Sequence, residues 1–218
     1  MLITILTLFP EILKPYLSSS IIGKAQKKEQ VAVKLVNIRD YAKDSHKTVD
    51  NRPYGGGAGM LLRVDIVHKA IIDNRLSQSG GKASPNEKII LTDPAGKIYN
   101  QAKARRFSRL DHLMIVAGHY EGIDERIKSF TDETVSIGRF ILTGGELPSL
   151  AIADSVIRLI PGVLKKAEAV RDESYSKKGL TESPQFTRPR EYLGLKVPEV
   201  LTRGNHSELD DWKKSHRK

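Results

Sequence analysis

The sequence of 218 residues contains no cysteine. This absence excludes disulfide bonds, zinc sites built on thiolates and cysteine nucleophiles. It also fits a reducing compartment, so we expect a cytoplasmic protein. Histidine is sparse as well, and neither His46 nor His206 stands in an H-x-x-H or H-E-x-x-H spacing. We therefore expect no metal site built from the protein's own side chains.

Long hydrophobic runs are missing too. No apolar stretch approaches the roughly 20 residues that a membrane-spanning helix needs, and we expect no membrane partner. Residues 1–12 are apolar but lack a basic leader and a small-residue cleavage site, which favours a first strand over a signal peptide. The chain also lacks G-x-G-x-x-G and P-loop motifs, so ordinary dinucleotide or nucleoside-triphosphate binding is not indicated.

Acidic residues are in deficit. The chain has 36 Lys and Arg against 26 Asp and Glu, a formal net charge of +10. Such a surplus indicates a polyanionic partner, with nucleic acid favoured over an anionic membrane. A basic helix is predicted at 100–110, and the predicted C-terminal helix at 207–218 ends in basic residues that would add phosphate contacts.

What the chain does contain is an alternation of strands and helices. This order predicts an α/β domain with a mostly parallel sheet, and 39% hydrophobic residues suit one large or two small domains. The hydrophobic patterns predict strands at 2–8, 31–38, 88–92, 112–117 and 135–142, and helices at 10–16, 21–28, 63–76, 100–110, 124–130 and 147–160.

The stretch from Val135 to Gly162 organises this pattern. A β-rich run leads into the turn 143–146, and an apolar-periodic helix follows, with Pro148 in its first turn and Pro161 with Gly162 at its end. A strand that breaks at glycines and opens a helix leaves backbone N–H groups free to bind the polar atoms of a ligand.

Glycines recur at the predicted ends of three strands in this half of the chain. They are Gly96, then Gly118 with Gly122, then Gly144 with Gly145. Open α/β sheets bind ligands at the carboxyl ends of their strands, so these three loops could line one pocket. Outside this half, residues 39–60 are polar, glycine-rich and long for an idle connection, and residues 165–190 form a charged linker or loop.

Several short motifs occur in a fixed order along the chain. They are LTLFPE, RPYGGGAGM, GHYEGIDER, SIGRFILTGGELP, DSVIRLIPGVL, SPQFTRP and RGNH. Each is weak alone, but together they resemble the bacterial tRNA (guanine-N(1)-)-methyltransferases of the SPOUT class, TrmD type. The resemblance runs from about Met1 to Trp212.

The resemblance implies a homodimer whose α/β domain contains a deep trefoil knot. It implies a knotted donor-binding domain at 1–160, an interdomain linker at 161–190 and a small, mainly helical tRNA-binding domain at 191–218. The methyl donor would be S-adenosylmethionine, and the substrate would be tRNA, methylated on ring N1 of the guanosine 3′-adjacent to the anticodon. It also implies magnesium, shared with the substrate rather than held in a carboxylate cage.

Carried over residue by residue, the resemblance places donor binding on the three glycine-bearing loops. The implied donor residues are Leu91, Thr92, Asp93, Pro94, Gly96, Gly118, Tyr120, Glu121, Gly122, Ile137, Gly138, Arg139, Phe140, Ile141, Leu142, Gly144 and Gly145.

Guanine N1 carries a proton, so a carboxylate must remove it while a cation steadies charge on the neighbouring oxygen. The resemblance assigns the cation to Arg158. It assigns the base to Glu173 or Asp172, because the family's Asp-Ser-Phe corresponds to 172–175 with a spacing that fits either; Glu173 is favoured.

Two departures from the family pattern keep alternatives open. Arg139 stands where relatives have an aspartate, and the chain stops at Lys218, soon after Trp212, where most relatives continue with more basic helix. The alternatives are a SPOUT methyltransferase with another RNA target and an RNA-binding homologue with impaired catalysis.

Overall fold

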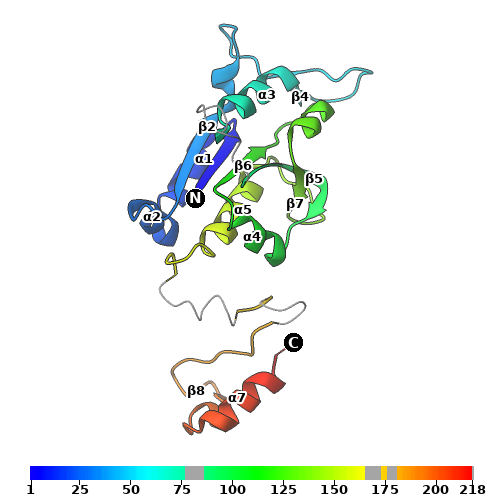
Figure 1. Ribbon diagram of the computed structural model, residues 1–218. Helices are drawn as coiled ribbons and strands as arrows, with labels where there is room; N and C mark the ends of the chain where they lie inside the picture. Colours follow the sequence, from blue (N-terminus) through cyan, green and yellow to red (C-terminus); the bar gives the residue numbers. More distant parts are fainter. Residues whose placement is uncertain (77–85, 165–172, 176–180, 218) are drawn as a thin grey trace. The chain divides into compact units, whose positions relative to one another are not determined.

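The computed structural model describes residues 1–76, 86–164, 173–175 and 181–217. The chain divides into two units, Met1–Lys165 and Lys166–Lys218, and each is described by itself. In the first unit, the predicted alternation of strands and helices is confirmed as an α/β fold (Figure 1).

A five-stranded sheet forms the centre of the first unit. All its neighbouring strands pair in parallel, in the order β2-β1-β6-β5-β7. The strands are β1 (Leu2–Thr7), β2 (Ala32–Asn37), β5 (Glu87–Ile98), β6 (His112–Ala117) and β7 (Glu133–Ser136). A separate antiparallel pair joins β3 (Asp50–Asn51) to β4 (Leu61–Leu62).

Helices cover both faces of the sheet. The α-helices of this unit are α1 (Pro10–Leu17), α2 (Ser20–Lys27), α3 (Val64–Asp73), α4 (Gln101–Phe107) and α5 (Glu146–Ile157), and the short 3₁₀ helices are η1 (Ile38–Tyr41) and η3 (Glu125–Phe130). One buried cluster joins the sheet to α1, α2, α4 and α5, and a second joins its other face to α3, η1 and η3.

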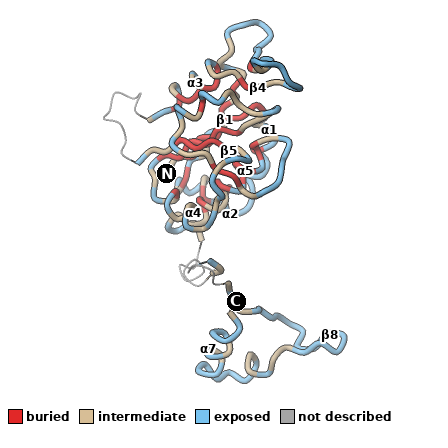
Figure 2. Tube along the Cα trace, turned by 90° about the vertical axis from the view of Figure 1, so that its right-hand side faces the viewer, coloured by how far each residue is buried: buried red, intermediate tan, exposed pale blue. Residues whose placement is uncertain are grey.

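The side-chain alternation of β1 shows how one strand serves both clusters. Ile3 and Ile5 belong to the first cluster, whereas Leu6 belongs to the second. Both faces of a parallel sheet are covered in this way, which explains why the strands are nearly continuous apolar runs. Figure 2 shows the buried residues gathered along these strands and on the inward sides of the helices.

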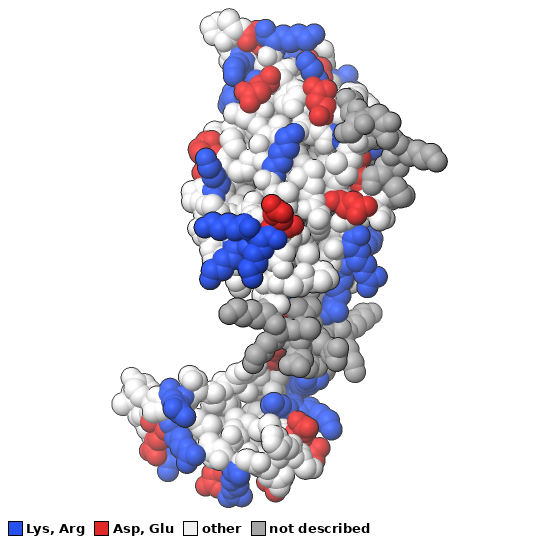
Figure 3. Space-filling model, turned by 60° about the vertical axis from the view of Figure 1, so that its left-hand side comes forward, with Lys and Arg blue, Asp and Glu red and all other residues white. Residues whose placement is uncertain are grey.

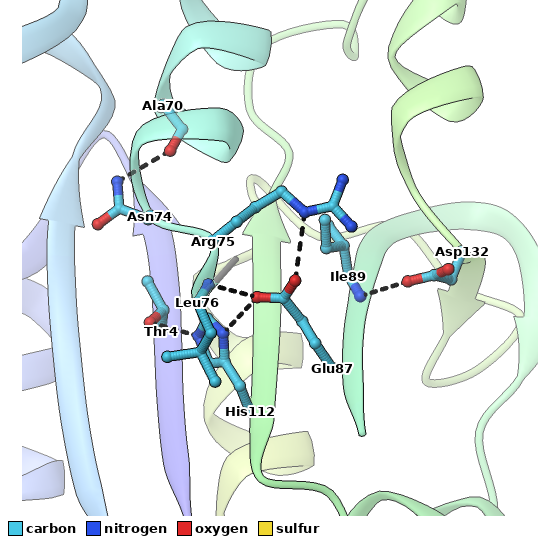
Figure 4. A network of polar contacts seen from close by, with 9 residues as sticks. All are labelled: Thr4, Ala70, Asn74, Arg75, Leu76, Glu87, Ile89, His112 and Asp132. Atoms are coloured by element: carbon cyan, nitrogen blue, oxygen red, sulfur yellow. Dashed lines mark hydrogen bonds and ion pairs between the residues drawn. The ribbon is translucent and has the colours of Figure 1, made fainter. Parts of the chain in front are cut away.

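A buried polar network joins three strands near their N-terminal ends (Figure 4). His112 Nε2 lies 2.8 Å from Thr4 Oγ1, and His112 Nδ1 lies 2.7 Å from Glu87 Oε1. Glu87 also accepts hydrogen bonds from the Leu76 N–H and from Arg75 Nε. Burial alone would raise the pKa of Glu87, but these hydrogen bonds and the nearby charges together hold it below its ordinary value.

Two predicted strand boundaries are wrong. The strand predicted to end at Thr92 continues to Ile98, with a register shift between Thr92 and Lys97 where it pairs with β7. The strand predicted over 135–142 ends at Ser136, and residues 137–145 form a loop. Apolar composition indicated strand there, but Phe140 and Ile141 are exposed rather than packed.

The helix predicted at 147–160 is α5, which begins at Glu146 and ends at Ile157. Its apolar residues do not follow a single stripe, because α5 is buried on most sides and only Leu147 and Ala151 are exposed. Gly162, with φ +84°, follows where the sequence predicted the stop.

The second unit is built from short elements. They are the hairpin of β8 (Glu191–Tyr192) and β9 (Leu195–Lys196), η4 (Glu199–Leu201) and α7 (His206–Ser215). The Asn205 side chain caps α7 by accepting the Ser207 N–H. None of its described residues is buried, so this part contributes no core of its own (Figure 2).

Candidate active site

A pocket of about 390 Å³ opens at the carboxyl ends of β6 and β7, beside the irregular part of β5. Three loops form it, following β6, following β7 and within the irregular part of β5. Its lining residues are Leu91, Thr92, Asp93, Pro94, Gly118, His119, Tyr120, Glu121, Gly122, Ile123, Val135, Ser136, Ile137, Gly138, Phe140, Ile141, Leu142, Thr143, Gly144, Gly145 and Pro148.

The pocket therefore brings together nearly all the residues implied for donor binding. Gly96 and Arg139 lie outside its lining. A Cβ at Gly96 would stand 2.6 Å from the Val135 nitrogen, so this glycine allows close packing of β5 on β7. Arg139 is exposed, between the lining residues Gly138 and Phe140.

Six lining residues were not in the predicted set: His119, Ile123, Val135, Ser136, Thr143 and Pro148. Most of them adjoin predicted members in the sequence. His119 stands between Gly118 and Tyr120 in the GHYEG motif, and this position in the motif could have identified it as a pocket residue.

The glycines let two loops approach one another closely. The Gly145 N–H donates to the Gly118 carbonyl at 2.6 Å, and His119 pairs with Gly144 in an antiparallel bridge. A Cβ at Gly145 would stand 2.6 Å from the Gly118 nitrogen. Glycine is needed here because a side chain would push the two loops apart. This reason adds to the one given by the sequence, that glycines leave backbone groups free to bind a ligand.

The glycine-rich segment 39–60 lies against the same pocket. The Glu121 N–H donates to the Met60 carbonyl, and Gly59, with φ +81°, leaves no room for a Cβ beside the Glu121 side chain. Arg39 donates to the Tyr120 hydroxyl at 3.3 Å. Between these two contacts, Tyr54 is fully exposed. A ligand bound to segment 39–60 would therefore lie next to the pocket loop that contains Tyr120 and Glu121.

Comparison with known proteins agrees with this geometry. The model of the family described as tRNA (Guanine-1)-methyltransferase TrmD matches residues 1–218. The chain belongs to this family.

Curated relatives carry the name tRNA (guanine-N(1)-)-methyltransferase. The protein from Bacillus licheniformis is 51% identical over 216 residues, covering 98% of this chain and 86% of the relative. The one from Bacillus subtilis is 49% identical over 215 residues, with the same coverage of 98% and 86%. The one from Mycoplasmopsis synoviae is 46% identical over 213 residues, covering 98% and 90%. The resemblance drawn from the motifs is thus confirmed.

The catalytic residues implied by the family fall in both units. Arg158 is the C-cap of α5 and is half-buried. Glu173 is half-buried in the second unit, next to Ser174, whose hydroxyl accepts the Glu182 N–H at 2.9 Å. Asp172 lies outside the described residues. The choice between Glu173 and Asp172 stays a prediction.

Positive charge on the surface is partly neutralised. Figure 3 shows basic side chains in several groups, most with acidic side chains beside them. In α4, Lys103 and Arg106 both pair with Glu133. Burial alone would raise the pKa of Glu133, but these two cations hold it below its ordinary value. Part of the positive charge of α4 therefore forms ion pairs within the fold.

Metal-ligand clusters and membrane-spanning helices are both absent from the described residues. Within residues 1–76, 86–164, 173–175 and 181–217, no three His, Cys, Asp or Glu side chains group as metal ligands would. Over the same residues, no helix has the length and apolar character needed to cross a membrane.

Proposed function

We propose that this chain transfers a methyl group from S-adenosylmethionine to ring N1 of the guanosine 3′-adjacent to the tRNA anticodon. One observation supports the proposal above others. A single pocket unites the three loops that the family motifs implicate, in a chain that belongs to the tRNA (Guanine-1)-methyltransferase family along its whole length.

The pocket fits the methyl donor in size and lining. Its volume of about 390 Å³ lies within the range of small-molecule sites. Leu91, Ile137 and Leu142 offer apolar contacts for an adenine ring, and the glycine loops offer backbone groups for its polar edge and the ribose. When bound, S-adenosylmethionine supplies an electrophilic methyl group on a positively charged sulfonium.

The protein's part in the chemistry is to prepare the guanine. Glu173, or alternatively Asp172, takes the proton from N1, so that the nitrogen lone pair can form the new bond to carbon. Arg158 donates hydrogen bonds to O6, the exocyclic oxygen beside N1, where negative charge builds as the proton leaves. Because Arg158 and Glu173 belong to different units, their cooperation is part of this proposal.

We assign tRNA binding to two regions. Segment 39–60 would hold the nucleotides near the target base, since it contacts the pocket loop through Glu121 and presents the exposed Tyr54. The tRNA-binding domain at 191–218 would add phosphate contacts through basic residues of α7 such as Lys213 and Lys214. Magnesium would be shared with the substrate, and the setting would be the cytoplasm.

We further propose a homodimer and a trefoil knot. Ile12 and Tyr16 on α1 and Leu147 on α5 are 53%, 48% and 58% exposed, on two helices that pack against each other. Exposed apolar side chains on adjacent helices suit an interface with a second copy. The knot is proposed from the family alone.

Methyl transfer to matched transcripts tests the reaction. Labelled S-adenosylmethionine is supplied with an unmodified tRNA carrying guanosine 3′ of the anticodon, or with the same tRNA carrying adenosine there. We expect label only in the guanosine transcript. Label in both, or in neither when the protein is folded, would overturn the assigned target.

A further inference from the structure

A buried carboxylate stands directly behind the donor pocket, and the reaction described above does not use it. Glu146 opens α5 and is 5% exposed. One of its oxygens accepts the Thr7 hydroxyl at 2.8 Å. The other lies 3.6 Å from Nδ1 of His119, which lines the pocket. Glu146 itself is outside the lining, behind His119 and Gly144, which both line the pocket.

His119 is held on several sides. Its ring centroid lies 4.8 Å from that of Phe9 and 5.0 Å from that of Tyr120. Its backbone pairs with Gly144, where a Cβ would stand 2.6 Å from His119 Nδ1. Nδ1 is buried and has no hydrogen-bond partner among the described residues, which leaves the Glu146 carboxylate as its charged neighbour.

A buried carboxylate is costly to retain unless its charge is used or compensated. The start of α5 and the Thr7 hydroxyl compensate part of this cost, because a helix N-terminus favours negative charge. His119 is not within hydrogen-bonding distance of it. The carboxylate therefore lies one side chain away from the pocket, close enough for its charge to act through space on a charged ligand bound there.

We propose that Glu146, acting behind His119, is a positioning residue that makes the pocket prefer the cationic donor over its uncharged product. This inference rests on the proposed function, because it takes the ligand to be S-adenosylmethionine. The demethylated product, S-adenosylhomocysteine, has the same adenosine and amino-acid parts but a neutral sulfur. A negative charge behind the pocket therefore stabilises the donor alone.

The prediction applies to the pair with a neutral imidazole, which carries one negative charge. Replacing Glu146 with glutamine then removes that charge from behind the pocket. The comparison is therefore made at a pH well above the ordinary histidine pKa of about 6.5. Asp93 and Glu121 also line the pocket and stay unchanged, so the difference between variants isolates Glu146.

Titration calorimetry on the full-length protein tests the proposal, with both ligands and three variants. Glu146→Gln should lower the donor-over-product affinity ratio about tenfold, the effect of one charge at roughly 10 Å in an effective dielectric constant of about 20. Thr7→Val removes a hydrogen bond but no charge, so it should leave the ratio within about twofold. Glu146→Asp keeps the charge and should also preserve the ratio, even if both affinities fall.

The ratio separates a charge effect from a structural one. Loosening of the pocket weakens both ligands equally, so an unchanged ratio in Glu146→Gln would overturn the proposal. If that variant fails to fold, a lowered ratio in Glu146→Asp would overturn it instead. Wild-type protein that binds neither ligand would contradict the proposed function, not the role of Glu146.

Discussion

Replacing Gly145 with alanine should weaken donor binding at least tenfold while leaving the chain folded. Gly145 has φ −82°, which alanine adopts without strain, so the effect is steric. The added Cβ would stand 2.6 Å from the Gly118 nitrogen and 2.8 Å from the Ala117 Cα, both backbone atoms. The hydrogen bond from Gly145 to Gly118 must then lengthen. We expect a loss of about 1 kcal/mol for this bond and about 1–3 kcal/mol for overpacking.

Two measurements on one preparation check this. Urea unfolding should show a stability loss of about 2–4 kcal/mol, the sum of those two terms, and calorimetry should show the weakened donor binding. Gly55→Ala is the matched control. Its φ of +83° costs alanine about 1 kcal/mol, but no atom lies within 4 Å of the new Cβ, so donor affinity should not change. A Gly145→Ala protein with wild-type donor affinity would refute the view that loop spacing shapes the pocket.

Four further predictions address the reaction, the dimer and the fold. Glu173→Gln should abolish turnover with donor binding nearly intact, whereas full activity in rapid-quench assays would move the base to Asp172. Arg158→Ala should reduce kcat more than tRNA affinity; the reverse pattern would make it a binding contact. Leu147→Glu should shift sedimentation from dimer to monomer, and an unchanged dimer would place the interface elsewhere. Glu87→Gln should lower the free energy of unfolding by about 2–4 kcal/mol at pH 7 and by less at pH 3. The lowered pKa of Glu87 stabilises the fold above its ordinary value of 4.5, and this stabilisation is lost as the pH falls through the folded-state pKa. Equal losses in urea unfolding at both pH values would contradict this.

The sheet could be predicted because its strands are buried on both faces. Short apolar runs such as HLMIVA in β6 are typical of such strands, and no helix among the described residues is long and apolar enough to cross a membrane. The predicted strand boundaries were wrong where apolar residues are not buried. Phe140 and Ile141 extend the apolar pattern of β7, yet they are exposed in a loop that lines the pocket. Apolar residues that line a pocket look like core residues in the sequence, so a strand was predicted there.

The candidate site could be predicted at the level of loops, but not of side-chain partners. Glycines at strand ends marked the loops, since parallel strands place those ends on one edge of the sheet. His119 was missed because its contacts come from Phe9, Gly144 and Glu146, which lie far from it in the chain. Gly96 was assigned to the donor, but its closeness to Val135 is visible only once β5 and β7 are paired.

The described residues of the second unit bear most directly on the partners of this protein. None of these residues is buried, and Tyr192, Leu193 and Leu195 are 65%, 85% and 77% exposed. The described residues of this unit therefore present apolar side chains to solvent beside the basic residues of α7. Since the chain belongs to a tRNA methyltransferase family, we expect the proposed tRNA partner to cover these side chains.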